Sequence, residues 1–293
     1  MVAHDSAVQS LSIQEYFEDM DIYTHHLATW PRSRLESAIR RRAQTTYLGQ
    51  GLVLARILGR FKMFLRSSDR GFACHLMLDG FWEMWLTQFL ASQIRAGMTV
   101  VDVGANFGYY TLLFADAVGE AGRVIAVEPN PDTAALLRET VNLNGYAKRT
   151  RIVPYALSSV DGSAWLYTPD GEPKNATLVE GPGCPGGHTI EVSTLTLDEV
   201  ALEYPRIDLI KIDAEGSEVN IIAGMRQLVA RDRPMIVLEF NAARYKEPRD
   251  LLDTLLGFYG GFQEISFNGE ISTVDIADVT DPRSVEDRLL LFR

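Results

Sequence analysis

The stretch "VVDVGANFGYYTLLFA", residues 100–115, decides the fold. It begins with a short apolar run that ends in an acid, continues through two glycines that bracket an asparagine, and closes with a helical pattern. A buried strand, a glycine turn and a helix in this order are typical of a parallel sheet built from βαβ units. In such sheets ligands bind at the carboxyl ends of the strands, so this turn is a candidate binding site.

The chain after residue 115 repeats the same rhythm. The apolar runs "RVIAVEP", "RIVPYALS", "IDLIKID" and "RPMIVLEF" are accompanied by the helical patterns "PDTAALLRETVNLNG" and "SEVNIIAGMRQLV". The runs "FQEISF" and "RLLLFR" near the end have no convincing helix after them, which favours an antiparallel pair at one sheet edge. The sequence therefore predicts an α/β fold with a doubly wound sheet, mostly parallel with an antiparallel last strand.

Two further segments flank or interrupt this pattern. Residues 1–75 are predicted to form a mainly helical extension, with "GLVLARILGRF" as a helix and "KMFLRSSDRGFACHLML" as a β-hairpin. We expect this extension to cover the site or to form a homodimer through its helices. Residues 76–293 are predicted to form the α/β domain, with a β-rich insertion at about residues 158–194.

Composition and charge exclude several classes of partner. The net charge is −11, and residues 98–293 hold 17 Lys and Arg against 30 Asp and Glu, so no nucleic acid partner is expected. No apolar run approaches the ~20 residues that cross a membrane, and residues 1–20 lack the features of a signal peptide. These features predict a cytoplasmic protein with no membrane partner, in which Cys74 and Cys184 are free thiols.

The glycine turn and one downstream acid indicate the kind of ligand. Gly104 and Gly108 bracket Asn106, so the dinucleotide fingerprint G-x-G-x-x-G is incomplete. Glu128 ends the second strand, where a carboxylate can accept hydrogen bonds from both hydroxyls of a ribose. Together these residues favour a nucleoside with a free ribose, and S-adenosylmethionine is such a ligand. A nucleotide-dependent oxidoreductase on the same fold is the alternative that the missing glycines argue against.

Several motifs resemble those of one family. "VVDVGANFGYYTLLFA", "GRVIAVEPNP", "YALSSVDG", "STLTLD" and "IDLIKIDAEGSEVNIIAGM" are similar, in this order, to the FkbM-type S-adenosylmethionine-dependent methyltransferases. The upstream segment "LDGFWE" is also similar, with Trp82 where the family suggests a tyrosine. The resemblance covers about residues 77–240. It implies a class I (Rossmann-like) methyltransferase fold and transfer of a methyl group to an oxygen, typically of a sugar or a secondary metabolite.

The resemblance also implies a set of cofactor-binding residues at the strand ends. The residues expected to hold the methionine end are Asp102, Gly104, Asn106 and Gly108. Those expected at the ribose and the adenine are Glu128, Pro129, Asn130, Ala156 and Leu157. Asp213 is expected beside the sulfur that carries the methyl group.

Carboxylates supply the candidate chemistry. "KIDAEGSE" contains Asp213, Glu215 and Glu218, and Glu239 ends the neighbouring strand, so four carboxylates should meet in one crevice. Such carboxylates raise one another's pKa unless a cation lies between them. The cofactor's sulfonium and Lys211 are the candidate cations. A divalent metal ion is possible but not expected, because the spacing does not require one.

An alcohol acceptor loses its proton as its oxygen attacks, so a carboxylate base is expected. The candidates are Glu215, Asp213 and Glu239, in that order. Carboxyl O-methylation on the same fold is one alternative function. A nucleoside-binding module without catalysis is another.

Overall fold

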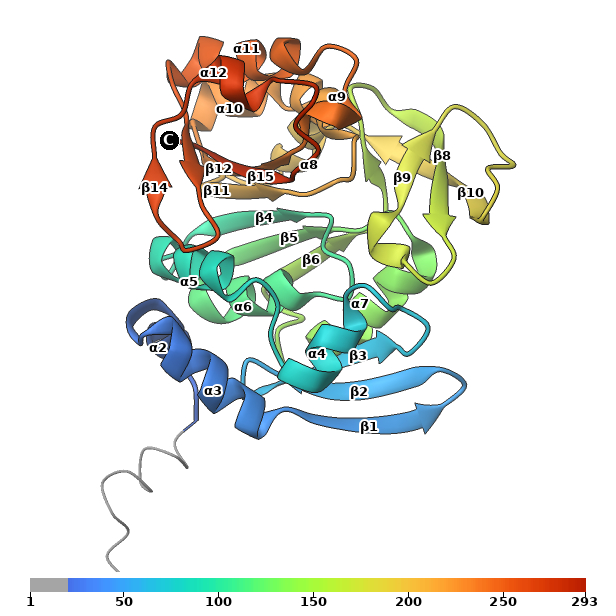
Figure 1. The fold of residues 1–293 in the computed structure, drawn as a ribbon, viewed down its shortest axis with the longest axis vertical. Helices are drawn as coiled ribbons and strands as arrows, with labels where there is room; N and C mark the ends of the chain where they lie inside the picture. The colour runs from blue at the N-terminus through green and yellow to red at the C-terminus, as the bar shows by residue number, and fades with distance from the viewer. Residues whose placement is uncertain (1–20) are drawn as a thin grey trace, which may run out of the picture.

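An eight-stranded sheet runs through the centre of the computed structural model, which describes residues 21–293 (Figure 1). Its strands, from edge to edge, are β14 (Ile271–Ser272), β13 (Gln263–Ile265), β15 (Arg288–Phe292), β12 (Met235–Phe240), β11 (Leu209–Ile212), β4 (Thr99–Val103), β5 (Arg123–Val127) and β6 (Thr150–Val153). The five strands from β12 to β6 are parallel, whereas β15, β13 and β14 pair antiparallel. The predicted doubly wound, mostly parallel sheet with an antiparallel end is confirmed, and it agrees with the class I fold that the resemblance implied.

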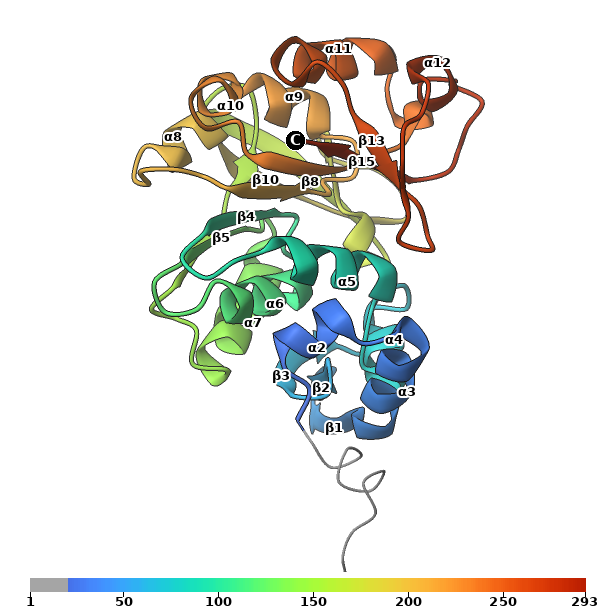
Figure 2. The same cartoon turned by 90° about the vertical axis from the view of Figure 1, so that its left-hand side faces the viewer.

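Helices cover both faces of the sheet. One face carries α5 (Met84–Gln93), α6 (Tyr109–Ala117) and α7 (Pro131–Leu143), as Figures 1 and 2 show. The other carries α8 (Leu197–Ala201), α9 (Glu218–Ala223), α10 (Arg226–Asp232) and α11 (Pro248–Tyr259). Successive residues of β4 contribute to opposite cores, since Val100 packs in the first and Val101 in the second. This double burial explains why the strand sequences are continuous apolar runs.

The N-terminal segment differs from the prediction. After α2 (Thr24–Thr29) and α3 (Arg32–Arg42), the chain forms a three-stranded antiparallel sheet of β1 (Gln44–Gly49), β2 (Leu52–Ile57) and β3 (Phe61–Arg66), followed by α4 (Ala73–Asp79). The mainly helical extension is therefore wrong for residues 44–66, and the second half of the predicted hairpin is α4. The run "GLVLARILGRF" is almost wholly apolar, so its composition fits a helix and a strand equally. Burial of Val53, Ala55 and Ile57 on one face shows the strand period. The part of the predicted helical extension before residue 21 lies outside the described residues.

This N-terminal layer packs against the large sheet's helices. Leu27 of α2 and Leu35 of α3 are buried in the same core as Leu90 of α5. Strand β3 is held by α7, because the amide of Phe64 donates to Thr140 Oγ1 at 3.1 Å. Apolar side chains of both N-terminal helices are thus buried within the chain. Covering of the site and oligomerisation remain predictions.

A smaller sheet stands beside the carboxyl edge of the central one. Its order is β7 (Ala156–Leu157), β10 (Gly187–Leu195), β8 (Gly162–Pro169) and β9 (Thr177–Val179), with the short 3₁₀ helix η1 (Pro173–Asn175) between β8 and β9 (Figure 1). Strands β8, β9 and β10 fall in the segment predicted as a β-rich insertion. Since β7 continues from the end of β6, the small sheet lies next to the candidate site.

The remaining short elements are η2 (Ala242–Arg244) after β12 and α12 (Ile276–Val279) before β15. Within residues 21–293, no helix combines the length and the apolar character needed to cross a bilayer. Cys74 and Cys184 are unpaired.

Candidate active site

A cavity of about 770 Å³ opens at the carboxyl ends of the parallel strands. It lies where the strand order reverses. Strands β5 and β6 follow β4 on one side of it, whereas the later strands β11 and β12 lie on its other side. Its wall includes Gly104 after β4, Glu128 after β5, Leu157 of β7 and Asp213 after β11. Leu178 of β9 adds a contribution from the small sheet.

In the glycine turn after β4, each residue type suits its position for a different physical reason. A Cβ on Gly104 would lie 1.8 Å from the carbonyl oxygen of Asp213, so the turn packs directly on the end of β11. Asn106 has a φ of 50°, a left-handed conformation that asparagine tolerates better than most residues. Gly108 has a φ of 103°, and a Cβ there would lie 2.6 Å from Leu137 of α7. Gly108 therefore serves helix packing.

Glu128 connects two walls of the cavity. Its carboxylate accepts hydrogen bonds from the amides of Asn106 and Asn130, both at 2.9 Å. Burial raises the pKa of Glu128 to about 7, even though both amides favour the charged form. The carboxylate thus holds the glycine turn in place and still lines the cavity where a ribose was expected.

The structure brings most of the predicted cofactor residues together. Those that line the cavity are Gly104, Asn106, Glu128, Pro129, Ala156, Leu157 and Asp213. Asp102, Gly108 and Asn130 lie behind its wall. Asp102 is 1% exposed and accepts a hydrogen bond from Thr111 at 2.6 Å, while Asn130 caps the first turn of α7. The local pattern places these residues at the turn but does not show which way their side chains face.

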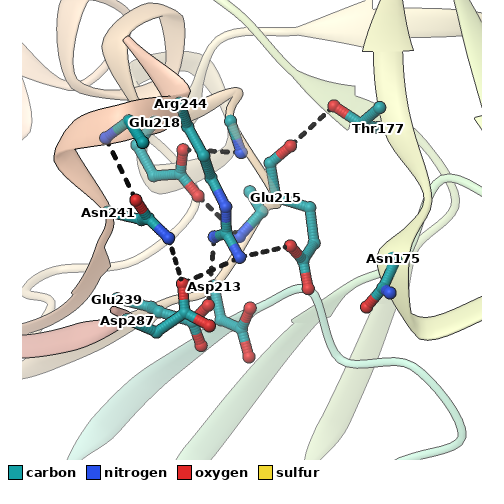
Figure 3. Close-up of polar contacts among 12 residues, drawn as sticks. Asn175, Thr177, Asp213, Glu215, Glu218, Glu239, Asn241, Arg244 and Asp287 are labelled. Carbon is teal, nitrogen blue, oxygen red and sulfur yellow. Dashed lines mark hydrogen bonds and ion pairs between the residues drawn. The ribbon is translucent and has the colours of Figure 1, made fainter. Parts of the chain in front are cut away.

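The predicted catalytic carboxylates also meet in the cavity. Asp213, Glu215 and Glu239 each offer an oxygen, and these oxygens lie within 4.8 Å of one another. Arg244 from η2 lies among them: its guanidinium is 2.9 Å from Glu215 and 3.1 Å from Glu239 (Figure 3). The same guanidinium is 2.9 Å from Asp287, just before β15.

Burial and neighbouring charges change the titration of this cluster. Burial, followed by the charge of Asp213, raises the pKa of Glu215 to about 7, although Arg244 opposes the change. Burial and the charges of Asp213 and Glu215 likewise raise the pKa of Glu239. Lys211 Nζ lies 3.1 Å from Asp213. Burial alone would lower the pKa of Lys211, but the carboxylates of Asp213 and Asp102 raise it overall.

Glu218 does not join the cluster, contrary to the expectation of four converging carboxylates. It is fully buried, and it accepts hydrogen bonds from the amides of Ala214 and Gly216, both at 2.9 Å, and from the Tyr245 hydroxyl at 2.6 Å. Glu218 therefore fixes the turn that carries Glu215. Glu218 is the first residue of α9, and its side chain reaches back to accept hydrogen bonds from the amides of the loop that precedes the helix.

Sequence reasoning missed Arg244, Asp287 and Glu83. Arg244 and Asp287 lie in irregular segments without a motif, and only the fold brings them to the carboxylates. Glu83 precedes α5, lines the cavity and has a φ of 36°. It is one of six non-glycine residues with positive φ in residues 21–293, of which Asn106 and Glu215 also line the cavity. Such backbone strain concentrates at functional sites, which is a signal that requires coordinates.

The three clustered carboxylates are the residues that could hold a divalent metal ion, since hard cations prefer oxygen ligands. Arg244 already contacts Glu215 and Glu239, and Lys211 contacts Asp213. Each of the three carboxylates is thus paired with a cationic side chain. The arrangement does not require a metal ion.

Comparison with known proteins gives a family match. A family model described as the methyltransferase FkbM domain matches residues 102–264. Hexuronic acid methyltransferase AglP of Haloferax volcanii is 25% identical over 200 residues, which cover 63% of this chain and 77% of that protein. Methyltransferase sdnD of Sordaria araneosa is 28% identical, with coverage of 43% and 60%, respectively.

The crystal structure of methyltransferase FkbM from Methylobacillus flagellatus matches with a TM-score of 0.45 and 15% identity. The match covers 72% of this chain and 53% of that one. This chain therefore spans about half the length of that protein and less than two thirds of sdnD.

Proposed function

The chain belongs to the FkbM methyltransferase family, and from this premise we propose that it transfers a methyl group from S-adenosylmethionine to a hydroxyl oxygen of a small-molecule acceptor. The observation that carries this proposal is the continuous cavity. It extends from Glu128, which suits a ribose, past Gly104 to the carboxylates around Glu215. One cavity thus offers a nucleoside site and a candidate base.

The residues of the cavity fit the cofactor. Glu128 presents a carboxylate for the ribose hydroxyls, and Pro129, Ala156 and Leu157 form an apolar border for the adenine. When bound, S-adenosylmethionine supplies an electrophilic methyl group on a positively charged sulfur. The backbone of Asp213 packs on the glycine turn, and Asp213 lines the cavity there, so its carboxylate can balance positive charge.

Glu215 is the first candidate for the base that removes the hydroxyl proton. A pKa of about 7 lets it accept a proton near neutral pH. Arg244 restrains its carboxylate through the 2.9 Å contact, and Thr177 of β9 donates to its main-chain carbonyl at 2.6 Å (Figure 3). Asp213 and Glu239 are the second and third candidates.

The acceptor is proposed to be a sugar or a secondary metabolite. The relative AglP is named a hexuronic acid methyltransferase, which supports a sugar-like acceptor. Trp82 and Phe267 line the same cavity and offer aromatic faces for a ring to stack against.

Calorimetric titration and methyl transfer test this proposal. We expect the protein to bind S-adenosylmethionine but not NAD, and to transfer a labelled methyl group to at least one hydroxyl compound in a panel of sugars, polyketides and carboxylic acids. Binding of NAD instead would support the oxidoreductase alternative. Binding of S-adenosylmethionine without transfer to any compound would favour a module without catalysis.

Carboxyl O-methylation is a second candidate, because Lys174 also lines the cavity and could bind an anionic acceptor. The two reactions give products that base treatment separates. A methyl ester releases methanol in mild alkali, whereas a methyl ether is stable. Release of the label as methanol would therefore favour the carboxyl reaction.

A further inference from the structure

The cavity wall carries a further acid, Glu83, to which no role has been given. Glu83 ends the segment "LDGFWE" and is the residue immediately before α5. We propose that Glu83, together with Asp213, binds the α-ammonium group at the methionine end of S-adenosylmethionine. This assignment rests on the proposed function, because it requires that cofactor.

The position of Glu83 supports this role. The hydroxyl of Tyr110, the second residue of α6, donates to Glu83 Oε2 at 2.9 Å. Helix α6 begins directly after the glycine turn, so Glu83 is held beside the part of the cavity where the methionine end was expected. The other carboxylate oxygen, Oε1, makes no hydrogen bond within residues 21–293 and remains available to a ligand.

Asp102, which was expected to hold the methionine end, cannot take this role in the observed arrangement. It is 1% exposed, does not line the cavity, and accepts a hydrogen bond from Thr111. Glu83 and Asp213 both line the cavity and lie close enough for their charges to interact. The ammonium group therefore has two carboxylates within the cavity wall.

Glu83 and Asp213 differ in their ion pairs. Burial raises the pKa of Glu83, and the negative charge of Asp213 raises it further. The hydrogen bond from Tyr110 and the charges of Lys211 and Lys174 oppose this rise in pKa. Lys211 pairs with Asp213 at 3.1 Å, whereas no residue in the described part of the chain forms an ion pair with Glu83. An ammonium group between Glu83 and Asp213 would interact with both carboxylates, and it would donate to Glu83 Oε1.

Two ligands that differ in the amino acid end test the contact between Glu83 and the ammonium group. S-adenosylhomocysteine carries the amino acid end, whereas 5′-methylthioadenosine keeps the adenosine and the thioether but lacks the ammonium and the carboxylate. Calorimetric affinities for both ligands are measured with the wild type, with Glu83→Gln and with Glu286→Gln. Glu286 is an exposed acid at the cavity rim, so its variant removes the same charge without the proposed contact.

We expect Glu83→Gln to weaken binding of S-adenosylhomocysteine about tenfold or more, on the scale of a hydrogen bond to a charged group. Its affinity for 5′-methylthioadenosine should equal that of the wild type, which also shows that the variant is folded. Glu286→Gln should bind both ligands as the wild type does.

Three results would overturn the assignment alone. These are unchanged affinity of Glu83→Gln for S-adenosylhomocysteine, an equal loss for both ligands, and an equal loss in Glu286→Gln. Unchanged affinity with lost turnover would make Glu83 a group that acts on the acceptor. A wild type that binds neither S-adenosylmethionine nor S-adenosylhomocysteine would instead overturn the proposed function and this assignment with it.

Discussion

Glu215 and Asp287 both contact the guanidinium of Arg244 at 2.9 Å, yet their surroundings differ. The side chain of Glu215 is 17% exposed and lies beside Asp213 and Glu239, whereas that of Asp287 is 50% exposed. An ion pair that is exposed to water contributes little to folding stability. A carboxylate in a partly closed cavity has a changed pKa and can act on a ligand. At the scale of single residues, the depth of burial therefore separates a candidate base from a simple counterion.

Glu215→Gln tests the proposed base. We expect turnover to fall by about 10²-fold or more, the usual effect of losing a general base, while S-adenosylmethionine still binds. Asp287→Asn is the matched control, since it removes another carboxylate from Arg244, and it should have a much smaller effect. Steady-state kinetics and calorimetry measure both quantities. Full activity of Glu215→Gln would exclude Glu215 as the base.

Gly104→Ala tests the close approach of the glycine turn to β11. The new Cβ would lie 1.8 Å from the Asp213 carbonyl oxygen. Gly145→Ala is the control, because both glycines have a φ of 76° but nothing lies within 4 Å of a Cβ at Gly145. The control should cost about 1–2 kcal/mol for the left-handed backbone. Gly104→Ala should cost roughly 1–3 kcal/mol more, as overpacking does. Equal free energies of unfolding in urea would contradict this reasoning.

At the scale of elements, the strands β1 to β3 show how an added layer is attached. The edge strand β3 places its backbone against α7. Asn144, at the end of that helix, forms hydrogen bonds with both the backbone amide and the backbone carbonyl of Lys62. The Lys62 amide donates to Asn144 Oδ1 at 3.0 Å, and Asn144 Nδ2 donates to the Lys62 carbonyl at 2.6 Å. Side chains of α7 thus replace a neighbouring strand, which satisfies part of the sheet edge.

Asn144→Ala should loosen this attachment. Loss of the two bonds to Lys62 should lower the free energy of unfolding by roughly 1–2 kcal/mol. The amide of Lys62 should also exchange its hydrogen faster. Asn142→Ala provides the control, because Asn142 is exposed on the same helix. If both variants unfold alike and the exchange rate does not change, α7 does not hold β3 through this side chain.

The elements also show where local patterns were sufficient. Helix α7 begins at Pro131 after the capping residue Asn130, and the apolar runs of β4, β5, β11 and β12 were all predicted as strands. Residues 52–57 were predicted as a helix and form β2, because a nearly continuous apolar run has no visible period. The antiparallel neighbours β1 and β3 select the strand, and this selection depends on tertiary pairing.

At the scale of the whole molecule, buried acids in a negatively charged chain make the folding stability depend on pH. The chain has a net charge of −11, and the folded cavity holds carboxyl groups whose ionisation burial disfavours. Glu128 and Glu215 have a pKa of about 7 in the folded chain and an ordinary value of 4.5. Between these values the folded state binds more protons than the unfolded state. Stability should therefore fall as the pH rises through this window.

Thermal unfolding tests this effect. The melting temperature should be a few degrees higher at about pH 6 than at about pH 8 in the wild type. Glu128→Gln should reduce the difference, since it removes one of the buried ionising groups. The control Glu247→Gln changes an exposed acid and should retain the difference. A melting temperature that rises with pH over this range would contradict the sign.

The sequence by itself determined the sheet and the edge at which the cavity opens. Alternating apolar runs and helical patterns are local properties, and in a parallel sheet they bring Gly104, Glu128 and Asp213 to the same edge. Only the tertiary structure decided which side chains face the cavity and which cations they meet. Asp102 and Glu218 turn inward, whereas Arg244 reaches Glu215 and Glu239. The physical reason is that side-chain direction and ion pairing depend on segments far apart in the chain, and no local pattern records their contacts.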